Sequence, residues 1–413
     1  MKTLVSLLLA LVVSCALQTV EAGEWRSIKM SGYDGPIKDL KIESVSYASG
    51  IDNIFKSTDQ GETWISMTVP SGDYVSLAVS GSTVLAGGNN PFGKGVISKS
   101  TNNGATWFQY AVNGLEPLTD VCFFEGGGII AVGGVGKVAR STDGGSTWDY
   151  SIIPGAGTLT VVTFSGELGW TSSYTGTLGK FFWTTTDRGQ TWSGGNPFSG
   201  EGAGDLAIVG TKGFGVGGAI NSPAKIYRTT DIGMPWQTSQ YETGLFKKIS
   251  FLNSLTGFAV GYNNAFHGII YRTSDGGDSW QKEGQMNNLR LYAVSAYGES
   301  VQVGSDSGYI FSIPTVIGIQ ISGTEIPSGY HLDQNYPNPF NPSTSITFSL
   351  PQGSETRLEV FDIAGRKEVL FSGFLRAGRY TYDFHSNDLA SGIYFYRLVT
   401  DKFTETKKMM LVK

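Results

Sequence analysis

The sequence contains few of the residues from which most catalytic and metal sites are built. Among its 413 residues there are two cysteines and three histidines. His267, His331 and His385 show no ligand spacing with one another or with a cysteine, so we expect no metal site and no cofactor. Cys15 lies in a segment that we expect to be removed, which leaves Cys122 as a single thiol without an internal disulfide.

Charged residues are also scarce. They make up 16% of the chain, and the formal net charge is −5. Neither half has the basic excess of a nucleic-acid binder, so we expect no nucleic-acid partner. Glycine is abundant instead, with 57 residues beside 12% aromatic residues. This composition excludes a coiled coil and a helical solenoid, and it indicates short strands joined by tight turns.

Only the N-terminus has a sustained apolar run. Residues 1–22 begin with Lys2, continue through the apolar stretch Leu4–Val13 and end in Val20-Glu21-Ala22, which is typical of a secretory signal peptide cut before Gly23. The run is too short to span a membrane. A lipoprotein is the alternative, because the residues before Cys15 loosely fit a lipid-attachment box. With the signal peptide cut before Gly23, we expect the mature protein to be exported and soluble.

One octapeptide recurs six times at nearly constant spacing. Its copies are Ser57–Trp64, Ser100–Trp107, Ser141–Trp148, Thr185–Trp192, Thr229–Trp236 and Thr273–Trp280. Their tryptophans are 41 to 44 residues apart, and the residues between copies divide into four short strands. A period of ~40 to 45 residues with four strands is typical of one β-propeller blade.

The two ends of the repeat region predict how the propeller closes. Residues 24–28 look like the strand that follows each octapeptide, whereas residues 291–313 supply three strands of a last repeat. Joined in one blade, these ends would give seven blades and leave no exposed sheet edge. We therefore predict an all-β fold with a seven-bladed propeller at residues 23–313, and six or eight blades are the alternatives.

The octapeptide resembles the Asp-box, or bacterial neuraminidase repeat, which has the pattern Ser/Thr-x-Asp-x-Gly-x-Thr/Ser-Trp. We expect its third residue to bond turn amides, its glycine to adopt a positive φ and its tryptophan to pack between sheets. This predicts structural roles for Asp59, Asn102, Asp143, Asp187, Asp231, Asp275, Trp64, Trp107, Trp148, Trp192, Trp236 and Trp280. Calcium is not expected at these turns, because the spacing is not that of an EF-hand.

The repeat region as a whole is similar to seven-bladed Asp-box propellers of the photosystem II assembly factor type. It is more loosely similar to sialidases and xyloglucanases. These resemblances imply an architecture and leave the function open.

A second module follows a linker at residues 314–328. Alternating strands at residues 329–413 predict a small Ig-like β-sandwich. Asn335–Pro342, Asp362–Arg366 and Thr406–Met409 resemble the type A C-terminal sorting domain of the type IX secretion system in Bacteroidetes. The resemblance implies binding to that machinery and cleavage of the domain, followed by release or attachment to surface lipopolysaccharide. A generic adhesion domain is the alternative.

We find no catalytic set in the propeller. A sialidase needs three converging arginines, but Arg140, Arg228 and Arg272 each occupy the same place before an octapeptide. A glycosidase would need two carboxylates ~5 to 9.5 Å apart, and no sequence rule pairs the candidates, which we expect at loops or strand ends: Asp120, Glu125, Glu167, Glu201 and Asp205. A glycoside hydrolase of the sialidase or xyloglucanase type therefore remains an alternative.

We expect a ligand-binding face where the connections between second and third strands gather with those between blades. Aromatic rings beside amides suit a sugar or an extended peptide, and we expect the lysines at the rim of the pore. The candidates are Phe92, Tyr174, Phe198, Tyr262, Phe266, Asn90, Asn196, Asn264, Lys94, Lys137, Lys180 and Lys225. They predict a secreted or surface-displayed, non-catalytic protein that binds a glycan or a protein. Ordinary turn residues, in a structural envelope or assembly protein, are the alternative.

Overall fold

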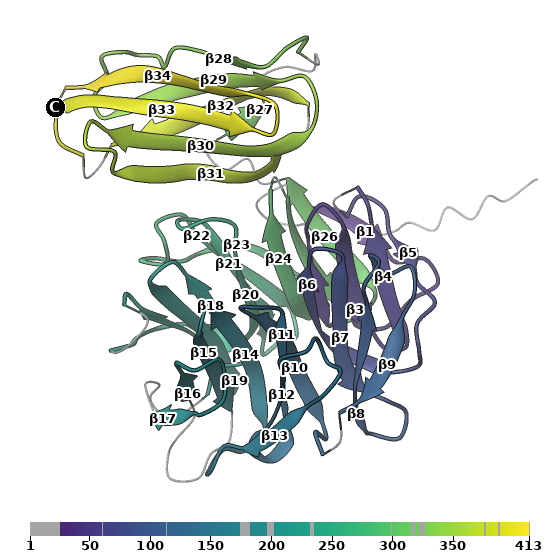
Figure 1. Cartoon of the computed structure of the whole chain (residues 1–413). Helices are drawn as coiled ribbons and strands as arrows, with labels where there is room; N and C mark the ends of the chain where they lie inside the picture. Colours follow the sequence, from purple (N-terminus) through teal and green to yellow (C-terminus); the bar gives the residue numbers. More distant parts are fainter. Residues whose placement is uncertain are drawn as a thin grey trace, which may run out of the picture.

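Nearly all of the regular secondary structure in the described part of the chain is β-strand. The computed structural model describes residues 25–412 except 60, 113, 174–181, 196–201, 232–234, 299, 315–318, 322–326, 376 and 387–388, so the predicted signal peptide lies outside the described residues. Within them the one helical element is the 3-10 turn η1 (Gly134–Gly136). No helix of this part of the chain is long and apolar enough to cross a membrane. Figure 1 shows a propeller in purple to green and a sandwich in green to yellow.

Seven blades make up the propeller over the described residues, and the first strand of each blade lines the central channel. Blades 1 and 2 consist of β2 (Asp39–Lys41), β3 (Ser46–Gly50), β4 (Asn53–Ser57) and β5 (Ile65–Ser66), and of β6 (Asp73–Ser80), β7 (Thr83–Asn89), β8 (Gly95–Ser100) and β9 (Phe108–Ala111). Blades 3 and 4 consist of β10 (Leu118–Phe124), β11 (Gly128–Gly133), β12 (Lys137–Ser141) and β13 (Asp149–Ile152), and of β14 (Leu159–Ser165), β15 (Leu168–Ser173), β16 (Phe182–Thr185) and β17 (Ser193–Gly195).

Blades 5 and 6 share a continuous hydrogen-bonded sheet. Its strands are β18 (Asp205–Val209), β19 (Lys212–Thr229), β20 (Gln237–Phe251), β21 (Gly257–Asn263), β22 (Gly268–Thr273) and β23 (Gln281–Met286). The long strands β19 and β20 each run through two strand positions. They bend at Gly218 and Gly244, whose φ angles are +121° and +151°. A Cβ on Gly244 would lie 2.5 Å from the Tyr262 carbonyl oxygen, so this bend requires glycine.

Blade 7 closes the ring as the sequence predicts. It consists of β24 (Leu291–Tyr297), β25 (Ser300–Ser305), β26 (Tyr309–Pro314) and, from the other end of the chain, β1 (Arg26–Lys29). β1 pairs antiparallel with β26 from Arg26 opposite Ser312 to Lys29 opposite Tyr309. Trp25 is buried in the same cluster as Val303 and Phe311. The predicted seven-bladed closure is thereby confirmed.

The described residues of the octapeptides follow the third strand of their blades. In the first copy, Asp59 Oδ1 accepts hydrogen bonds from Ser57 Oγ (2.7 Å) and from the Thr63 amide (2.9 Å), while Oδ2 accepts one from Thr63 Oγ1 (2.6 Å). Trp64 Nε1 donates to the Gly61 carbonyl (3.0 Å), and Gly61 has a φ of +83°. The same carboxylate bonds recur at Asp143, Asp187 and Asp275. These carboxylates are therefore occupied by their own turns.

The copy with asparagine keeps the same turn. Asn102 Oδ1 accepts from the Thr106 amide, and its Nδ2 donates to Thr106 Oγ1, both at 2.9 Å. An amide can replace the carboxylate here because the threonine hydroxyl is able to accept as well as donate. In the fifth copy, Thr229 Oγ1 donates to Asp231 (3.2 Å), and residues 232–234 lie outside the described chain.

Side chains on the inner strands link six of the seven pairs of neighbouring blades. We call these bonds the clasps, and in each one a side-chain oxygen accepts a hydrogen bond from an amide in, or directly after, the inner strand of the following blade. The clasps join Asp39 to Leu77, Ser76 to Val121, Asp120 to Val162, Asp205 to Ile249, Ser250 to Ala296 and Ser295 to Ile42, at 2.7 to 3.2 Å. They link blades 1–2, 2–3, 3–4, 5–6, 6–7 and 7–1.

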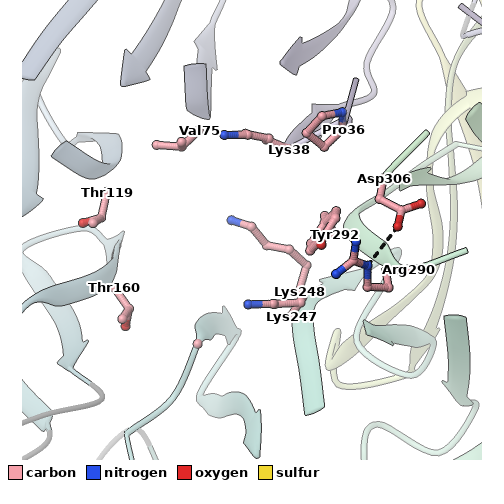
Figure 2. Close-up of a pocket in the computed structure, with 11 residues that line it drawn as sticks. Pro36, Lys38, Val75, Thr119, Thr160, Lys247, Lys248, Arg290, Tyr292 and Asp306 are labelled. Atoms are coloured by element: carbon pink, nitrogen blue, oxygen red, sulfur yellow. Dashed lines mark hydrogen bonds and ion pairs between the residues drawn. The ribbon is translucent and has the colours of Figure 1, made fainter. Parts of the chain in front are cut away.

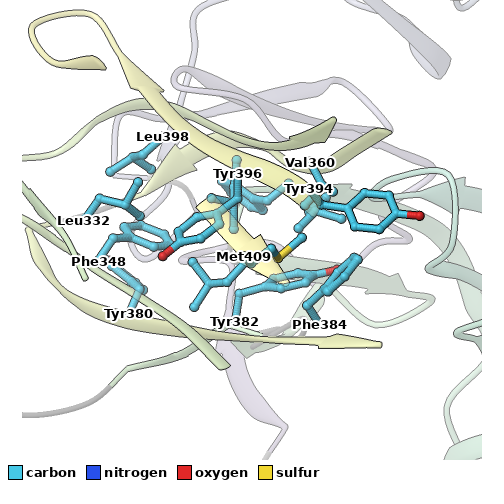
Figure 3. Close-up of a cluster of buried hydrophobic side chains, with 14 of the residues drawn as sticks. Leu332, Phe348, Val360, Tyr380, Tyr382, Phe384, Tyr394, Tyr396, Leu398 and Met409 are labelled. Atoms are coloured by element: carbon cyan, nitrogen blue, oxygen red, sulfur yellow. The ribbon is translucent and has the colours of Figure 1, made fainter. Parts of the chain in front are cut away.

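The C-terminal strands form the predicted sandwich of two antiparallel sheets. One sheet has the order β27 (Ile319–Ile321), β32 (Gly378–His385), β29 (Ser343–Leu350) and β28 (His331–Leu332). The other has the order β31 (Lys367–Leu375), β30 (Ser354–Asp362), β33 (Gly392–Thr400) and β34 (Thr404–Leu411). Figure 3 shows the aromatic core between them, in which Phe348, Tyr396 and Met409 are fully buried.

The proline-rich segment before β29 is tied to this core. Tyr396 Oη accepts a hydrogen bond from the Asn335 amide and donates one to the Asp333 carbonyl, both at 2.7 Å. Phe340 is buried, and its amide donates to the Met410 carbonyl (2.9 Å). The segment thus holds the last strand of the sandwich in place.

Candidate ligand-binding site

Lys248, whose side chain is 20% exposed, lies between two cavities of the central channel. The cavity at the mouth, which we call the vestibule, has a volume of about 570 Å³, and the cavity below it has about 360 Å³. Lys248 lines both. The vestibule is lined by Pro36, Lys38, Val75, Thr119, Thr160, Gly204, Lys247, Lys248, Arg290, Tyr292 and Asp306 (Figure 2). Its volume is in the range of small-molecule sites.

A bulge in the inner strands places these side chains at the vestibule. The antiparallel register shifts at the start of five inner strands, and the residues skipped by the pairing are Val75, Thr119, Thr160, Lys247 and Tyr292. A bulged residue leaves the alternation of the strand and is turned in a new direction. Because the bulge recurs around the ring, one side chain from each of five blades lines the vestibule.

The vestibule has one cationic wall and one largely uncharged wall. Lys38, Lys247 and Arg290 lie on one side in Figure 2, opposite Thr119 and Thr160. The two threonine hydroxyls already donate to backbone carbonyls of the next blade, at 2.6 and 2.8 Å. Their remaining lone pairs can accept hydrogen bonds from a ligand.

One of the three cations has no acidic partner. Lys38 pairs with Asp73 (2.5 Å), and Arg290 pairs with Asp306 (2.9 Å). Among the described residues, no acceptor lies within ion-pair or hydrogen-bond distance of Lys247, and burial lowers the pKa of its ammonium group. An anionic ligand would supply the missing partner.

Three buried aspartates hold Lys248 at the neck of the channel. Its Nζ lies 3.6 Å from Asp205 Oδ1 and 3.8 Å from Asp39 Oδ1. Burial alone lowers the pKa of Lys248, but Asp205, Asp39 and Asp120 outweigh it and raise that pKa. Burial raises the pKa of Asp120 and of Asp205. The ammonium therefore takes the place that a bound cation would occupy among these carboxylates.

The carboxylates considered for glycoside hydrolysis differ in their surroundings. Asp120, inside β10, and Asp205, the first residue of β18, are 7% exposed and engaged in clasps. Both follow the vestibule position of an inner strand and so face the channel neck. Glu125 and Glu167 both pair with Arg188, at 3.5 and 2.8 Å, and Glu201 lies outside the described residues.

The arginines before the octapeptides do not converge. Arg140, Arg228 and Arg272 lie on β12, β19 and β22, the third strands of three blades. Arg140 Nε donates to the Arg188 carbonyl (2.7 Å), whereas the other two pair with Asp278 and Glu283. Each guanidinium therefore serves its own part of the blade periphery.

Aromatic side chains from blades 6 and 7 form what we call the aromatic rim, defined by Tyr262, Phe266 and Tyr292. The Tyr262 ring lies 6.2 Å from that of Phe266 and 6.0 Å from that of Tyr292, which also lines the vestibule. The Arg290 guanidinium lies 5.9 Å from the centre of the Tyr262 ring and 5.5 Å from that of the Phe266 ring. Phe266 is 48% exposed and has a φ of +59°. Such a backbone is uncommon for a bulky residue and points to a constrained turn.

Other members of the predicted ligand face lie elsewhere. Asn90 Oδ1 accepts from the amides of Phe92 and Lys94 and closes its own turn, which leaves the Phe92 ring 87% exposed. Lys94 pairs with Glu116 (2.8 Å). Asn264 bonds Asn221 in the neighbouring connection at 3.1 Å. Tyr174, Asn196, Phe198 and Lys180 lie outside the described residues.

Two of the lysines expected at the pore rim, Lys137 and Lys225, are among the described residues, and neither lines the vestibule. Lys137 lines a separate cavity with Tyr150 and Ile152, and Lys225 is buried in β19. Both stand on third strands, which are two strands away from the channel. Lys137 and Lys225 therefore lie away from the pore rim at which they were expected.

The vestibule residues were missed, although a sequence signal exists for six of them, Lys247 included. From blade 2 to blade 7, the vestibule residue of the inner strand stands 11 or 12 residues after the octapeptide tryptophan. The residues at this place are Val75, Thr119, Thr160, Gly204, Lys247 and Tyr292. Aligning the repeats on the tryptophans would have brought this ring together.

No metal centre is found in the part of the chain that the structure describes. There, no three histidine, cysteine, aspartate or glutamate side chains are grouped so that they could hold a metal ion. Cys122 is a free thiol that lines the lower cavity.

Comparisons with known proteins divide along the two modules. Residues 334–413 match the family described as the secretion system C-terminal sorting domain. A comparison with curated proteins found no match. Among solved structures, the chain is similar to "YCF48 bound to D1 peptide", with a TM-score of 0.55 and 16% identity over 70% of this chain and 95% of that chain.

Two further structures show the same fold. YCF48 from Cyanidioschyzon merolae has a TM-score of 0.56 and 14% identity over 71% of this chain and 99% of its own. The WD40 repeats of RRP9 have a TM-score of 0.56 and 10% identity over 72% of this chain and 99% of their own. At these identities the likeness shows the fold alone, and it confirms the predicted similarity to propellers of the photosystem II assembly factor type.

The family match confirms the resemblance that the proline-rich segment and the terminal strands carry. Such a domain implies export out of the cell, to its surface or beyond. Residues 334–413 are therefore a type IX secretion C-terminal sorting domain, attached to a seven-bladed β-propeller.

Proposed function

We propose that this protein is a non-catalytic binding protein that captures a glycan or a protein segment outside the cell. The observation that carries this proposal is the vestibule, which opens at the end of the channel and presents an unpaired ammonium beside an aromatic rim. Of the loop residues expected to bind, Tyr262 and Phe266 belong to this rim. Asn90, Lys94 and Asn264 instead bond their own turns or neighbouring side chains. The sorting domain delivers the propeller, and release or attachment to lipopolysaccharide would follow its removal.

Two comparisons support binding rather than turnover. A propeller of the same fold is described as bound to a peptide, and another belongs to the WD40 class. The buried carboxylates at the neck are engaged by amides and by Lys248, which leaves them poorly suited to act as a general acid and base. A glycoside hydrolase of this fold is the competing function.

Binding of immobilised glycans and peptides by the mature protein tests this proposal. We expect retention of a ligand without product, and loss of retention when the vestibule is blocked by Thr160→Trp. The same replacement at Phe92, on an exposed turn, serves as the control. Release of product sugars would overturn the non-catalytic assignment, and binding unaffected at the vestibule would overturn the site.

A further inference from the structure

The charge of the vestibule restricts the ligand class. Lys38 and Arg290 are neutralised by Asp73 and Asp306, but Lys247 has no acidic neighbour within reach among the described residues. The Lys247 ammonium is partly removed from water, so an anion that pairs with it gains a charge-assisted hydrogen bond. Lys248 closes the floor below, because it is held by the carboxylates at the neck. A ligand therefore enters from the mouth and ends at the cation.

The backbone of the channel is not available to an extended peptide. A peptide that joins a sheet needs unpaired amides along an edge strand. Here, inner-strand amides such as those of Leu77, Val162 and Ile249 already donate to clasp carboxylates of the preceding blade, at 2.7 to 2.9 Å. Recognition in the vestibule must therefore come from side chains.

The threonine oxygens of the vestibule can accept hydrogen bonds from the hydroxyl groups of a ligand. The Thr119 and Thr160 hydroxyls give their protons to backbone carbonyls and keep lone pairs for a ligand. A sugar supplies several hydroxyl protons to such acceptors. The aromatic rim adds ring surface at the same mouth through Tyr292.

We propose, on the basis of the binding function above, that the vestibule recognises an acidic sugar, with the carboxylate of a uronic acid paired to Lys247. The carboxylate replaces the missing partner of the ammonium. Sugar hydroxyls donate to Thr119 and Thr160, and the adjoining sugar rests against the aromatic rim.

Titration calorimetry of the mature protein with trigalacturonate and with its methyl ester tests the proposal. The two probes share their hydroxyl groups and differ in the charge of the carboxyl groups. We expect the acid to bind at least about tenfold more tightly, because a charge-assisted bond is lost in the ester. The preference should weaken as salt is raised.

Matched variants identify the cation. Lys247→Met keeps the length of the side chain and should remove the preference for the acid, whereas Lys212→Met, at a lysine that bonds the Gly276 carbonyl, should keep it. Phe266→Ala should weaken both probes without changing their ratio. Thermal unfolding of each variant shows whether it is folded.

The outcomes separate this inference from the proposed function. Equal binding of acid and ester, or a preference that survives Lys247→Met, overturns the uronate assignment. Tighter binding of an acidic peptide that Lys247→Met abolishes also overturns it, while leaving a binding vestibule intact. Failure of every glycan and peptide probe to bind overturns both.

Discussion

At the neck of the channel, one ammonium group balances several carboxylates that have little access to water. Removing one partner of such a group leaves unpaired buried charge. We predict that Lys248→Met lowers the free energy of unfolding by about 3–5 kcal/mol, measured by urea denaturation. The control is Lys41→Met, since Lys41 is 41% exposed and lies 3.8 Å from Asp39. A loss as small as that of the control would contradict this account of the neck.

The octapeptide turns make a second prediction at the scale of single residues. Burial raises the pKa of Asp187, but hydrogen bonds from Thr185 and Thr191 outweigh it and lower the pKa to about 2. A lowered pKa in the folded state stabilises the protein above the unfolded value, and this stability is lost as pH falls from ~4 toward 2. Asp187→Asn should therefore reduce the loss of stability in acid.

The asparagine copy supplies the control for that experiment. Asn102 keeps both bonds to Thr106, so Asp187→Asn should cost less than about 1 kcal/mol at pH 7, whereas Asp187→Ala should cost about 1–3 kcal/mol. Thermal unfolding between pH 2 and pH 7 measures both. An unchanged acid profile in both variants would show that this carboxylate does not contribute.

Single residues differ in how well the sequence predicts them. The partners of Asp59 are at most four residues away, so the octapeptide contains its own turn. Lys247, Arg290 and Lys38 belong to three different blades, so they line one cavity only after the ring has closed. Local chemistry could therefore be read from the sequence, and the vestibule could not without first aligning the repeats.

Among the elements, β1 closes the ring, because it is the only strand of blade 7 that comes from the opposite end of the described chain. Trp25 precedes it and is 8% exposed within the blade 7 cluster. We predict that Trp25→Ala lowers the free energy of unfolding by about 3–5 kcal/mol, measured in urea.

The neighbouring residue is the matched control. Arg26 pairs with Glu62 on the surface, and its side chain is 56% exposed, so Arg26→Ala should cost less than about 1 kcal/mol. Equal losses of unfolding free energy in the two variants would mean that the pairing of β1 with β26 does not depend on Trp25.

Strands within a blade were predicted better than strands between blades. In blade 3 the residues around the octapeptide divide into the four expected strands, β10 to β13, because short apolar runs and glycine turns bound each strand. The merging of blades 5 and 6 was not foreseen. It depends on the pairing of β19 with β20 around Gly218 and Gly244, which is a long-range contact that no local pattern contains.

For the whole molecule, the sandwich determines where the propeller is delivered. Met409 is fully buried on β34, whereas the side chain of Met410 points outward and is 39% exposed. We predict that Met409→Asp disrupts the sandwich and abolishes export in cells with a type IX system, because a carboxylate is forced into its core. Met410→Asp should be exported normally. Surface labelling and culture supernatants measure both, and full export of the Met409 variant would contradict the prediction.

Closure of the ring by its earliest strand also sets the order of events during biogenesis. β1 emerges from the ribosome first, yet its partner β26 follows about 280 residues later, so blade 7 is necessarily the last to be completed. Long-range pairings of this kind form slowly. If the chain crosses a membrane unfolded, β1 stays unpaired until β26 has also crossed. The vestibule, which needs the closed ring, would form only after that step.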